Sequence, residues 1–394
     1  MLAIPTGRIR LSPQRDAARY QSHLWIFDGD VAEVSGTPAP GDVVDVFSSK
    51  QRFVGRGFYN PHSKIRVRLL TFREEPIDEP FFIARLQAAV ALRELVVSDA
   101  TACRLVYGEG DLLPGLIVDR FGDTAVMQAL GYGMDLRKDM LAELLLKHGR
   151  VNSVYLRNDA KSRALEGLPL EKGFVRGTSS TTVEIREAGA RFLVDIAEGQ
   201  KTGWFCDQRD NRLAAARVAQ GSVLEVFCHS GAFGIQAALQ GARSVEGVDV
   251  SASAVKLAHR HAELNGVEAR CRYRQADAFE ELRRLERESV RYDMIILDPP
   301  AFARSKHAIP HALAGYKEIN LRGIRLLRSG GVLVSCSCSH PISDQEFWSM
   351  LQSAARDAGR QVRLLEQRGQ APDHPVLFGM PETRYLKCYI LQAF

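Results

Sequence analysis

The stretch S-V-L-E-V-F-C-H-S-G-A-F-G, residues 222–234, decides the fold of the C-terminal half of the chain. Its aliphatic run, which ends at Cys228, is typical of a buried strand, and a glycine-containing turn then leads into a helical pattern. The same alternation recurs downstream, with strands expected at 244–250, 269–277, 292–298 and 332–339. Such regular alternation of strands and helices predicts a doubly wound, mostly parallel sheet.

The helices of this region carry local boundary signals. Ser251 or Ser253 is expected to cap a helix that ends at Asn265 and Gly266. Other helical patterns follow the later strands and also occur upstream, where a hairpin separates two of them. The expected ranges are helices over 316–331, from about 343, over 81–96 and over roughly 135–148, with the hairpin over 108–130.

The chain has 394 residues, which is too long for one hydrophobic core. Short alternating strands and turns predict a small β-barrel over residues 1–75. An acidic, proline-containing linker leads to a mixed α/β middle domain over 76–188, and the doubly wound domain occupies 189–394.

The positive charge of the chain is concentrated at its N-terminus. Residues 1–73 contain eleven Lys and Arg against six Asp and Glu, which accounts for a formal net charge of +5. Lys64, Arg66 and Arg68 alternate along an expected strand and would form a row of cations on one face. This pattern favours contact with a polyanion such as nucleic acid, with an ordinary solvated surface as the alternative.

The cysteine pattern excludes some site classes. Seven cysteines without a C-x-x-C pair, and no signal-peptide core or long apolar stretch, predict a cytosolic protein without disulfides or a zinc site. Cys336 and Cys338 form a C-x-C pair on one strand face. Packing and catalysis remain as the roles of these two thiols.

Several polar side chains stand where the expected parallel strands end, which is where ligands bind in such sheets. Asp249 suits a ribose diol, since a carboxylate accepts two hydroxyl hydrogen bonds, and Asp277 suits an adenine amino group. The turn after the first strand offers one close-approach glycine, Gly231, rather than the glycine cluster that a dinucleotide pyrophosphate needs. Ribose and adenine without a diphosphate favour S-adenosylmethionine over NAD. Asp298 and Cys338 complete the set of strand-end residues.

The ordered motifs of this region resemble those of class I S-adenosylmethionine-dependent methyltransferases. Two further motifs resemble the bacterial ribosomal RNA large subunit methyltransferase I family, over nearly the whole chain. The general motifs are E-V-F-C-H-S-G-A-F-G, G-V-D-V-S, E-L-N, Q-A-D-A-F and L-D-P-P-A-F, and the two further ones are K-T-G-W-F-C-D-Q-R-D-N-R (201–212) and D-H-P-V-L (373–377). The resemblance implies a PUA-type RNA-binding domain, a small middle domain and a Rossmann-like methyltransferase domain.

The family resemblance also implies an activity and a set of roles. The activity is methylation of carbon 5 of a cytidine in 23S ribosomal RNA, either naked or in an assembly particle. Asp249 would bind the cofactor ribose and Asp277 the adenine end. The residues implied on the methionine side are Phe227, Ser230 and Gly231, with Arg209 at the methionine carboxylate.

Carbon 5 of cytosine is a poor nucleophile, so its methylation requires a thiolate that first adds to carbon 6. Cys338 is the predicted nucleophile because it lies nearest the strand end and falls on the family's S-C-S motif, whereas Cys336 is expected to pack. Asp298, protonated or sharing a proton, is predicted to hydrogen-bond ring nitrogen 3. The prolines from Pro299 onward fix the backbone, and Phe302 is predicted to stack on the extruded base.

Some questions stay open at this level. The proton on carbon 5 could leave through His340, Cys336 or water. The D-P-P-aromatic element also occurs in methyltransferases that act on purine nitrogens without a thiol, which is the main alternative. An NAD-dependent dehydrogenase and a non-catalytic ribosome-assembly factor are weaker alternatives. The oligomeric state is left open, a homodimer included.

Overall fold

The computed structural model describes residues 5–13 and 22–394, which form two compact units. The first unit holds the described residues up to 186, together with 193–206 and 372–383. The second unit holds 187–192, 207–371 and 384–394. The two units are not consecutive in the sequence, because the segments 193–206 and 372–383 pack with the N-terminal part of the chain.

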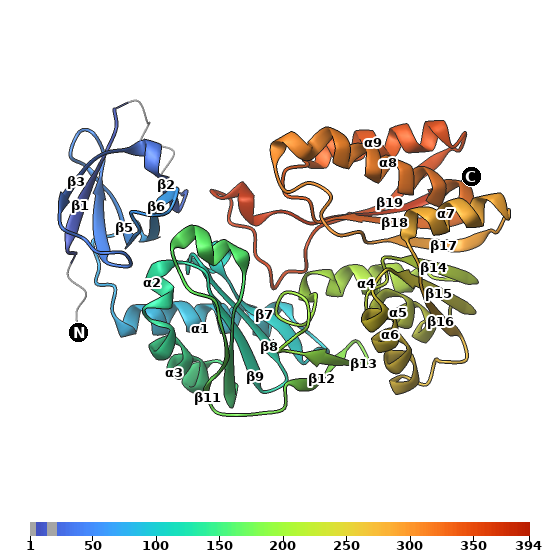
Figure 1. The fold of residues 1–394 in the computed structure, drawn as a ribbon, viewed down its shortest axis with the longest axis horizontal. Helices are drawn as coiled ribbons and strands as arrows, with labels where there is room; N and C mark the ends of the chain where they lie inside the picture. The colour runs from blue at the N-terminus through green and yellow to red at the C-terminus, as the bar shows by residue number, and fades with distance from the viewer. Residues whose placement is uncertain (1–4, 14–21) are drawn as a thin grey trace. The chain divides into compact units, whose positions relative to one another are not determined.

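The N-terminal part of the first unit is a six-stranded sheet in the order β2-β6-β5-β4-β1-β3 (blue in Figure 1). Neighbouring strands are antiparallel except for the β1–β4 pair, which is parallel. The sheet buries a core that includes Ile9, Val46 and Val67, and Met380 from the 372–383 segment joins it. The strands are β1 Gly7–Leu11, β2 Trp25–Phe27, β3 Val31–Gly36, β4 Val43–Phe47, β5 Phe53–Tyr59 and β6 Ile65–Thr71.

A second sheet, in the order β11-β10-β9-β8-β7, forms the rest of the first unit with helices α1 and α3. The helices expected over 81–96 and 135–148 and the hairpin expected within 108–130 are confirmed by α1, α3 and the β8–β9 pair. The bounds are α1 Glu79–Val96, β7 Ala102–Tyr107, β8 Leu116–Phe121, β9 Thr124–Ala129, α2 Tyr132–Asp135, α3 Lys138–His148, β10 Ser153–Asn158 and β11 Glu171–Arg176. A hairpin of β12 Thr182–Glu187 and β13 Ala190–Asp195 follows.

The second unit contains a seven-stranded sheet in the order β16-β15-β14-β17-β18-β20-β19. The first five strands of that order are parallel neighbours, and β20 runs antiparallel between β18 and β19. The prediction of a doubly wound, mostly parallel sheet is therefore confirmed. The strands are β14 Ser222–Val226, β15 Ser244–Asp249, β16 Cys271–Gln275, β17 Tyr292–Leu297, β18 Leu327–Ser337, β19 Val362–Arg368 and β20 Lys387–Ala393.

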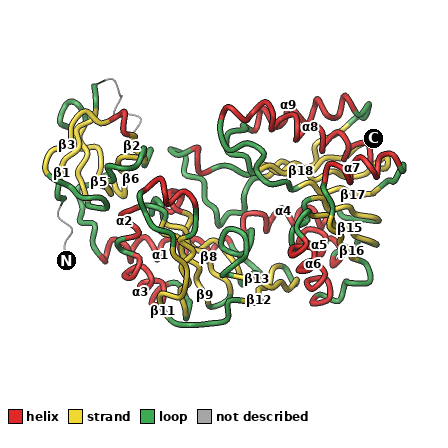
Figure 2. The backbone as a smooth tube through the Cα atoms, in the orientation of Figure 1, coloured by secondary structure: helices red, strands yellow, loops and turns green. Residues whose placement is uncertain are grey.

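Helices cover both faces of this sheet, as the red segments on either side of the yellow strands in Figure 2 show. The core on the α7–α8–α9 face includes Leu282, Tyr316 and Phe347 packed on Leu224 and Ile295. Helices α4, α5 and α6 lie on the other face. The bounds are α4 Arg209–Arg217, α5 Ala232–Leu239, α6 Ala252–Leu264, α7 Ala278–Arg287, α8 Ile309–Leu326 and α9 Asp344–Asp357.

Local capping explains where two of these helices begin. The Ser251 side chain accepts a hydrogen bond from the backbone N–H of Ala254, so Ser251 rather than Ser253 caps α6. Ser343 and Glu346 form a reciprocal capping box at α9. The predicted 316–331 helix is wrong at both ends: α8 begins at Ile309, because Pro310 is tolerated in a first turn, and Leu327 already belongs to β18.

A buried ion pair fixes α4 within the second unit. The Arg212 guanidinium donates from Nε to Glu187 Oε1 at 2.6 Å and from Nη2 to Oε2 at 2.5 Å, and both side chains are at most 3% exposed. Gln236 of α5 donates to the carbonyl oxygen of Glu187 at 2.6 Å. This geometry lets a bidentate pair offset the cost of removing both charges from water.

Removing one partner of this pair should therefore destabilise the protein strongly. Arg212→Ala removes the bidentate partner of the buried Glu187 carboxylate, and we expect a loss of about 3–5 kcal/mol in unfolding free energy by chemical denaturation. The double variant Arg212→Met, Glu187→Leu should recover most of that loss. A single variant as stable as the native protein would contradict this role of the pair.

Candidate active site at the carboxyl ends of the parallel strands

Five parallel strands end at the same edge of the second-unit sheet, so the residues that follow them converge there. Strand β15 ends at Asp249 itself, and Asp298 and Cys338 are the first residues after β17 and β18. Phe227 follows β14 and Asp277 stands just after β16. The predicted strand-end residues of the C-terminal domain thus share one edge of one sheet.

The turn after β14 has an unusual backbone. Phe227, His229 and Gly231 have φ values of 63°, 46° and 75°, a region in which only glycine is free of strain. The N–H of Cys228 donates to the carbonyl of Val248 at 3.0 Å, which ties this turn to the neighbouring strand. Two strained non-glycine residues in one short turn are typical of a segment shaped for a ligand.

Asp249 holds that turn in place. Its Oδ2 accepts the backbone N–H of His229 at 2.8 Å, and its Oδ1 accepts the N–H of Ser251 at 2.9 Å. The carboxylate is half-buried, and each of its oxygens has a second lone pair. Asp249 is therefore able to organise the turn and still accept two hydroxyl groups.

The sequence indicated Gly231 as a glycine that a ligand approaches closely, whereas in the structure a protein side chain lies against it. A Cβ atom at this position would stand 2.7 Å from the ring of Tyr273, so the close neighbour of Gly231 is a tyrosine of β16. Ser230 is also buried, and its carbonyl accepts a hydrogen bond from His261 Nδ1 at 3.0 Å. Both residues shape the turn from within the fold.

Asp277 is the N-cap of α7. Its Oδ1 accepts the N–H groups of Phe279 and Glu280 at 2.9 and 3.0 Å. The residue is exposed at the sheet edge. Capping uses Oδ1, which leaves Oδ2 able to meet a ligand.

Glu225 is a buried acid that the sequence analysis missed. Its two carboxyl oxygens accept the N–H groups of Phe233 and Gly234 in the first turn of α5, at 3.2 and 3.0 Å. Burial raises the pKa of Glu225 to about 8, and these two N–H groups oppose the rise. The residue lies inside an aliphatic strand, and only the fold shows that it faces the start of α5.

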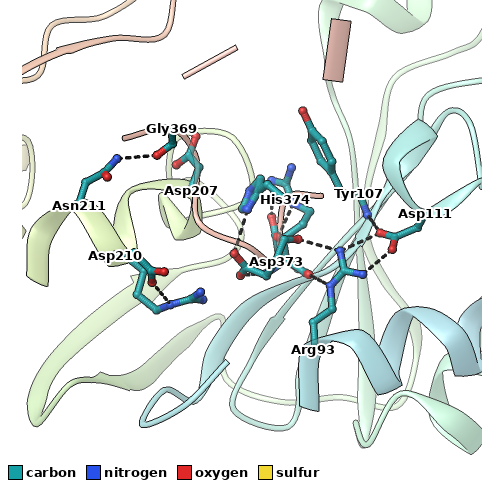
Figure 3. Close-up of polar contacts among 12 residues, drawn as sticks. Arg93, Tyr107, Asp111, Asp207, Asp210, Asn211, Gly369, Asp373 and His374 are labelled. Carbon is teal, nitrogen blue, oxygen red and sulfur yellow. Dashed lines mark hydrogen bonds and ion pairs between the residues drawn. The ribbon is translucent and has the colours of Figure 1, made fainter. Parts of the chain in front are cut away.

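The Asp-Pro-Pro segment is linked to α4 through Gln208. The Gln208 amide donates from Nε2 to Asp298 Oδ1 at 2.8 Å, and Gln208 Oε1 accepts from Asn211 at 2.7 Å. Asn211 also donates to the carbonyl of Gly369 at 3.0 Å (Figure 3). Gln208 stands next to the residue that the sequence emphasised, Arg209, which is buried and donates to Asp210 at 2.9 Å.

The two cysteines of the C-x-C pair lie in different surroundings. Cys336 is fully buried, and its contact with Cys388 on β20, together with burial, raises its pKa well above the usual range. Cys338 is half-buried, and its Sγ lies 3.9 Å from the carbonyl oxygen of Pro299. Among the chain's seven thiols, all in described residues, the other six are buried. Cys338 alone is therefore placed beside the Asp-Pro-Pro segment with access to solvent.

Phe302 belongs to an aromatic cluster. Its ring centroid lies 4.6 Å from that of Tyr316, 6.3 Å from that of Phe227 and 6.1 Å from that of Phe279. The ring is half-buried, with packing on one side against the α8 core. The predicted stacking of Phe302 on a base would have to use its remaining exposed part.

The three predicted cations of the N-terminal unit do not form one open row. Lys64 is exposed but precedes β6, whereas Arg66 donates to the carbonyl of Pro61. Arg68 pairs with the buried Glu166 at 2.9 Å, which offsets its charge. Both guanidinium groups therefore have partners within the first unit, and the predicted contact of Lys64, Arg66 and Arg68 with a polyanion stays a prediction.

The D-H-P-V-L motif anchors the 372–383 segment within the first unit (Figure 3). Arg93 donates to the carbonyl of Asp373 at 2.7 Å and pairs with Asp111, and the Asp373 carboxylate accepts the N–H of Arg104 at 3.0 Å. The His374 ring lies 5.2 Å from that of Tyr107. The motif therefore has a structural role in this unit.

The described residues contain neither a metal-binding cluster nor a membrane-spanning helix. No group of three or more His, Cys, Asp or Glu in residues 5–13 and 22–394 is placed to hold a metal ion. No helix in the same residues is long and apolar enough to cross a membrane.

Comparison with known proteins agrees with this geometry. Residues 9–72 match a PUA-like domain, and residues 156–383 match the S-adenosylmethionine-dependent methyltransferase family. A putative methyltransferase structure from Streptococcus mutans superimposes with a TM-score of 0.83 at 20% identity, covering 98% of this chain and 99% of that one. A second solved structure with the same TM-score, identity and coverage is a putative methyltransferase complexed with SAH. The fold and the strand-end site define a class I S-adenosylmethionine-dependent methyltransferase.

Curated relatives give the family more narrowly. Proteins of Alteromonas mediterranea and Shewanella denitrificans, both named ribosomal RNA large subunit methyltransferase I, are 40% and 41% identical to this chain. Each alignment covers 98% of this chain and 99% of the relative. The chain belongs to the ribosomal RNA large subunit methyltransferase I family. The predicted family, fold class and cofactor, S-adenosylmethionine, are confirmed.

The buried Glu225 carboxyl should make stability depend on pH. The unfolded group releases its proton near the ordinary pKa of 4.5, whereas the folded group keeps it up to about 8. The folded state therefore binds more protons across this window, and its stability falls as pH rises. Between about pH 5.5 and 7.5 we expect the native protein to lose about 2–3 kcal/mol more unfolding free energy than Glu225→Gln, by urea denaturation.

The matched control is Glu263→Gln, which changes an exposed carboxyl of α6. It should keep the pH dependence of the native protein. Equal slopes for the native protein and Glu225→Gln would show that Glu225 is ionised in the folded state at neutral pH.

Proposed function

We propose that the protein methylates carbon 5 of a cytidine in 23S ribosomal RNA of the large subunit, with Cys338 as the nucleophile. The observation that carries the proposal is the placement of Cys338, the half-buried thiol at the end of β18, 3.9 Å from the Pro299 carbonyl of the Asp-Pro-Pro segment. The PUA-like domain and the names of the curated relatives support ribosomal RNA as the substrate. This substrate would place the protein in the cytoplasm.

The strand-end donors fit the cofactor by their chemistry. Asp249 would accept the two ribose hydroxyl groups while holding the turn, and Asp277 would accept the adenine amino group through the oxygen that does not cap α7. Phe227, Ser230 and Gly231 would form the wall on the methionine side. Arg209 would meet the methionine carboxylate. When bound, S-adenosylmethionine supplies an electrophilic methyl group.

The thiolate of Cys338 would add to carbon 6 of the cytosine, which makes carbon 5 nucleophilic enough to take the methyl group. A base then removes the proton from carbon 5, the bond between Sγ and carbon 6 breaks, and the thiolate returns. Cys336 is unsuited as this base because it is fully buried, so His340 or a water molecule would accept the proton.

Asp298 and Phe302 would act on the base itself. Asp298, held by Gln208 through Oδ1, would in its protonated form donate a hydrogen bond to ring nitrogen 3 and stabilise the charge that develops as the thiolate adds. Pro299 fixes the backbone carbonyl that Cys338 contacts. Phe302 would contact the extruded base with the part of its ring that its aromatic neighbours leave exposed.

In the N-terminal sheet, Lys64 would contact the RNA backbone, and Arg66 and Arg68 would help to shape that surface.

Replacing the nucleophile tests the proposal. With unmodified large-subunit ribosomal RNA and labelled cofactor, Cys338→Ala should lower the methylation rate at least about 1,000-fold, because the step at carbon 6 has no substitute. Cys336→Ala, on the same strand, should retain methylation. Nucleoside mass analysis of the product should give 5-methylcytidine. A Cys338→Ala protein that works at the native rate, or a methylated purine in the product, would contradict the proposal and favour methylation of a purine nitrogen.

The role of Asp249 is tested by cofactor affinity. Asp249→Asn replaces one carboxylate oxygen by an amide donor, so we expect calorimetry to show S-adenosylmethionine binding weakened about tenfold or more. Glu263→Gln on α6 is the matched control and should bind as the native protein does. Unchanged affinity of Asp249→Asn, in a protein with the native thermal midpoint, would remove Asp249 from the cofactor site.

A further inference from the structure

Lys387 is a buried cation beside the proposed nucleophile. It is the first residue of β20, it pairs with Ser337 at the end of β18, and it is only 4% exposed. Its Nζ donates to the carbonyl oxygens of Ser339 at 3.1 Å and Tyr385 at 2.9 Å. The ammonium group is thus aimed at the backbone of the segment that carries Cys338.

No carboxylate forms an ion pair with Lys387 among residues 5–13 and 22–394. An ammonium group has three donors and is costly to bury without an opposite charge. Burial accordingly lowers the pKa of Lys387, while Asp344 and Cys338 oppose the shift. A buried cation without a carboxylate partner, bonded to the carbonyl of the residue that directly follows Cys338, suits an anion that forms at that sulfur.

Other charged or titratable groups around this position already have partners. Asp344 pairs with the exposed Arg384 at 3.1 Å, and Glu346 accepts hydrogen bonds from Ser343 as part of the α9 cap.

The Tyr316 hydroxyl on α8 bonds Ser337 and Ser339, and burial raises its pKa. His340 stacks on Tyr385 with centroids 5.0 Å apart, and Asp298 accepts from Gln208. Lys387 is the buried member of this set that carries a positive charge.

We propose that Lys387 is a positioning residue that stabilises the thiolate of Cys338 and fixes the backbone that follows it. The inference deepens the proposed function and rests on it for its meaning in catalysis. Its physical content, a cation that favours the ionised sulfur, is independent of the RNA substrate. An opposite charge at short range favours the ionised form of a thiol.

The test measures how fast iodoacetamide alkylates Cys338 in the full-length protein as pH varies, with peptide mass spectrometry to identify the site. Neither RNA nor cofactor is present, so the result is separate from the fate of the proposed function. Lys387→Gln keeps amide donors for the two carbonyls but removes the charge. We expect it to slow alkylation at pH 7 about tenfold, whereas Lys387→Arg should stay within about twofold of the native rate.

Lys256→Met, which changes an exposed lysine of α6, is the matched control and should leave the profile unchanged. The six buried cysteines report folding, because they react only in an unfolded variant. If Lys387→Gln does not fold, the native profile decides: its midpoint should lie at lower pH than that of a cysteine in an unstructured peptide. A native midpoint at or above the peptide's, or a folded Lys387→Gln with the native profile, would overturn the proposal.

Discussion

The end of β18 is the constraint on which the proposed chemistry depends. The strand is buried from Gly331 to Ser337, whose hydroxyl bonds Tyr316 and whose backbone pairs with Lys387 of β20. Cys338 is the next residue, so the same pairing that buries Cys336 brings Cys338 out at the sheet edge. A shift of the pairing by one residue would turn both thiols to the opposite face of the sheet, because side chains alternate between faces along a strand.

Buried titratable side chains have different kinds of partner in the scaffold and at the candidate site. In the scaffold, Arg212 and Glu187 form a bidentate pair, which leaves neither charge uncompensated. At the site, Glu225 accepts backbone N–H groups and keeps its proton at neutral pH, and Lys387 donates to backbone carbonyl oxygens. Groups without a counter-charge respond strongly to a ligand or to a new charge nearby, which is why perturbed residues gather at functional sites.

The sequence predicted the parts of this structure that depend on local signals. Strand and helix alternation predicted the parallel sheet, and the cap of α6 was narrowed to Ser251 or Ser253 because capping involves only the next three residues. Residues whose roles depend on partners elsewhere in the chain were missed. They are Glu225 of β14, which bonds the first turn of α5; Gln208, which bonds Asp298; and Lys387 of β20, which bonds the carbonyl of Ser339. Gly231 was noticed, but its neighbour is Tyr273, 42 residues later in the chain.

The central claim is a covalent bond between Cys338 and carbon 6 of a cytosine. RNA that contains 5-fluorocytidine tests it directly, because fluorine at carbon 5 cannot leave as a proton does and the adduct stalls after methyl transfer. The account predicts a stable protein–RNA adduct that requires S-adenosylmethionine, with the mass shift on the peptide that contains Cys338. Full methylation of ordinary RNA without any adduct on the fluorinated RNA would contradict it.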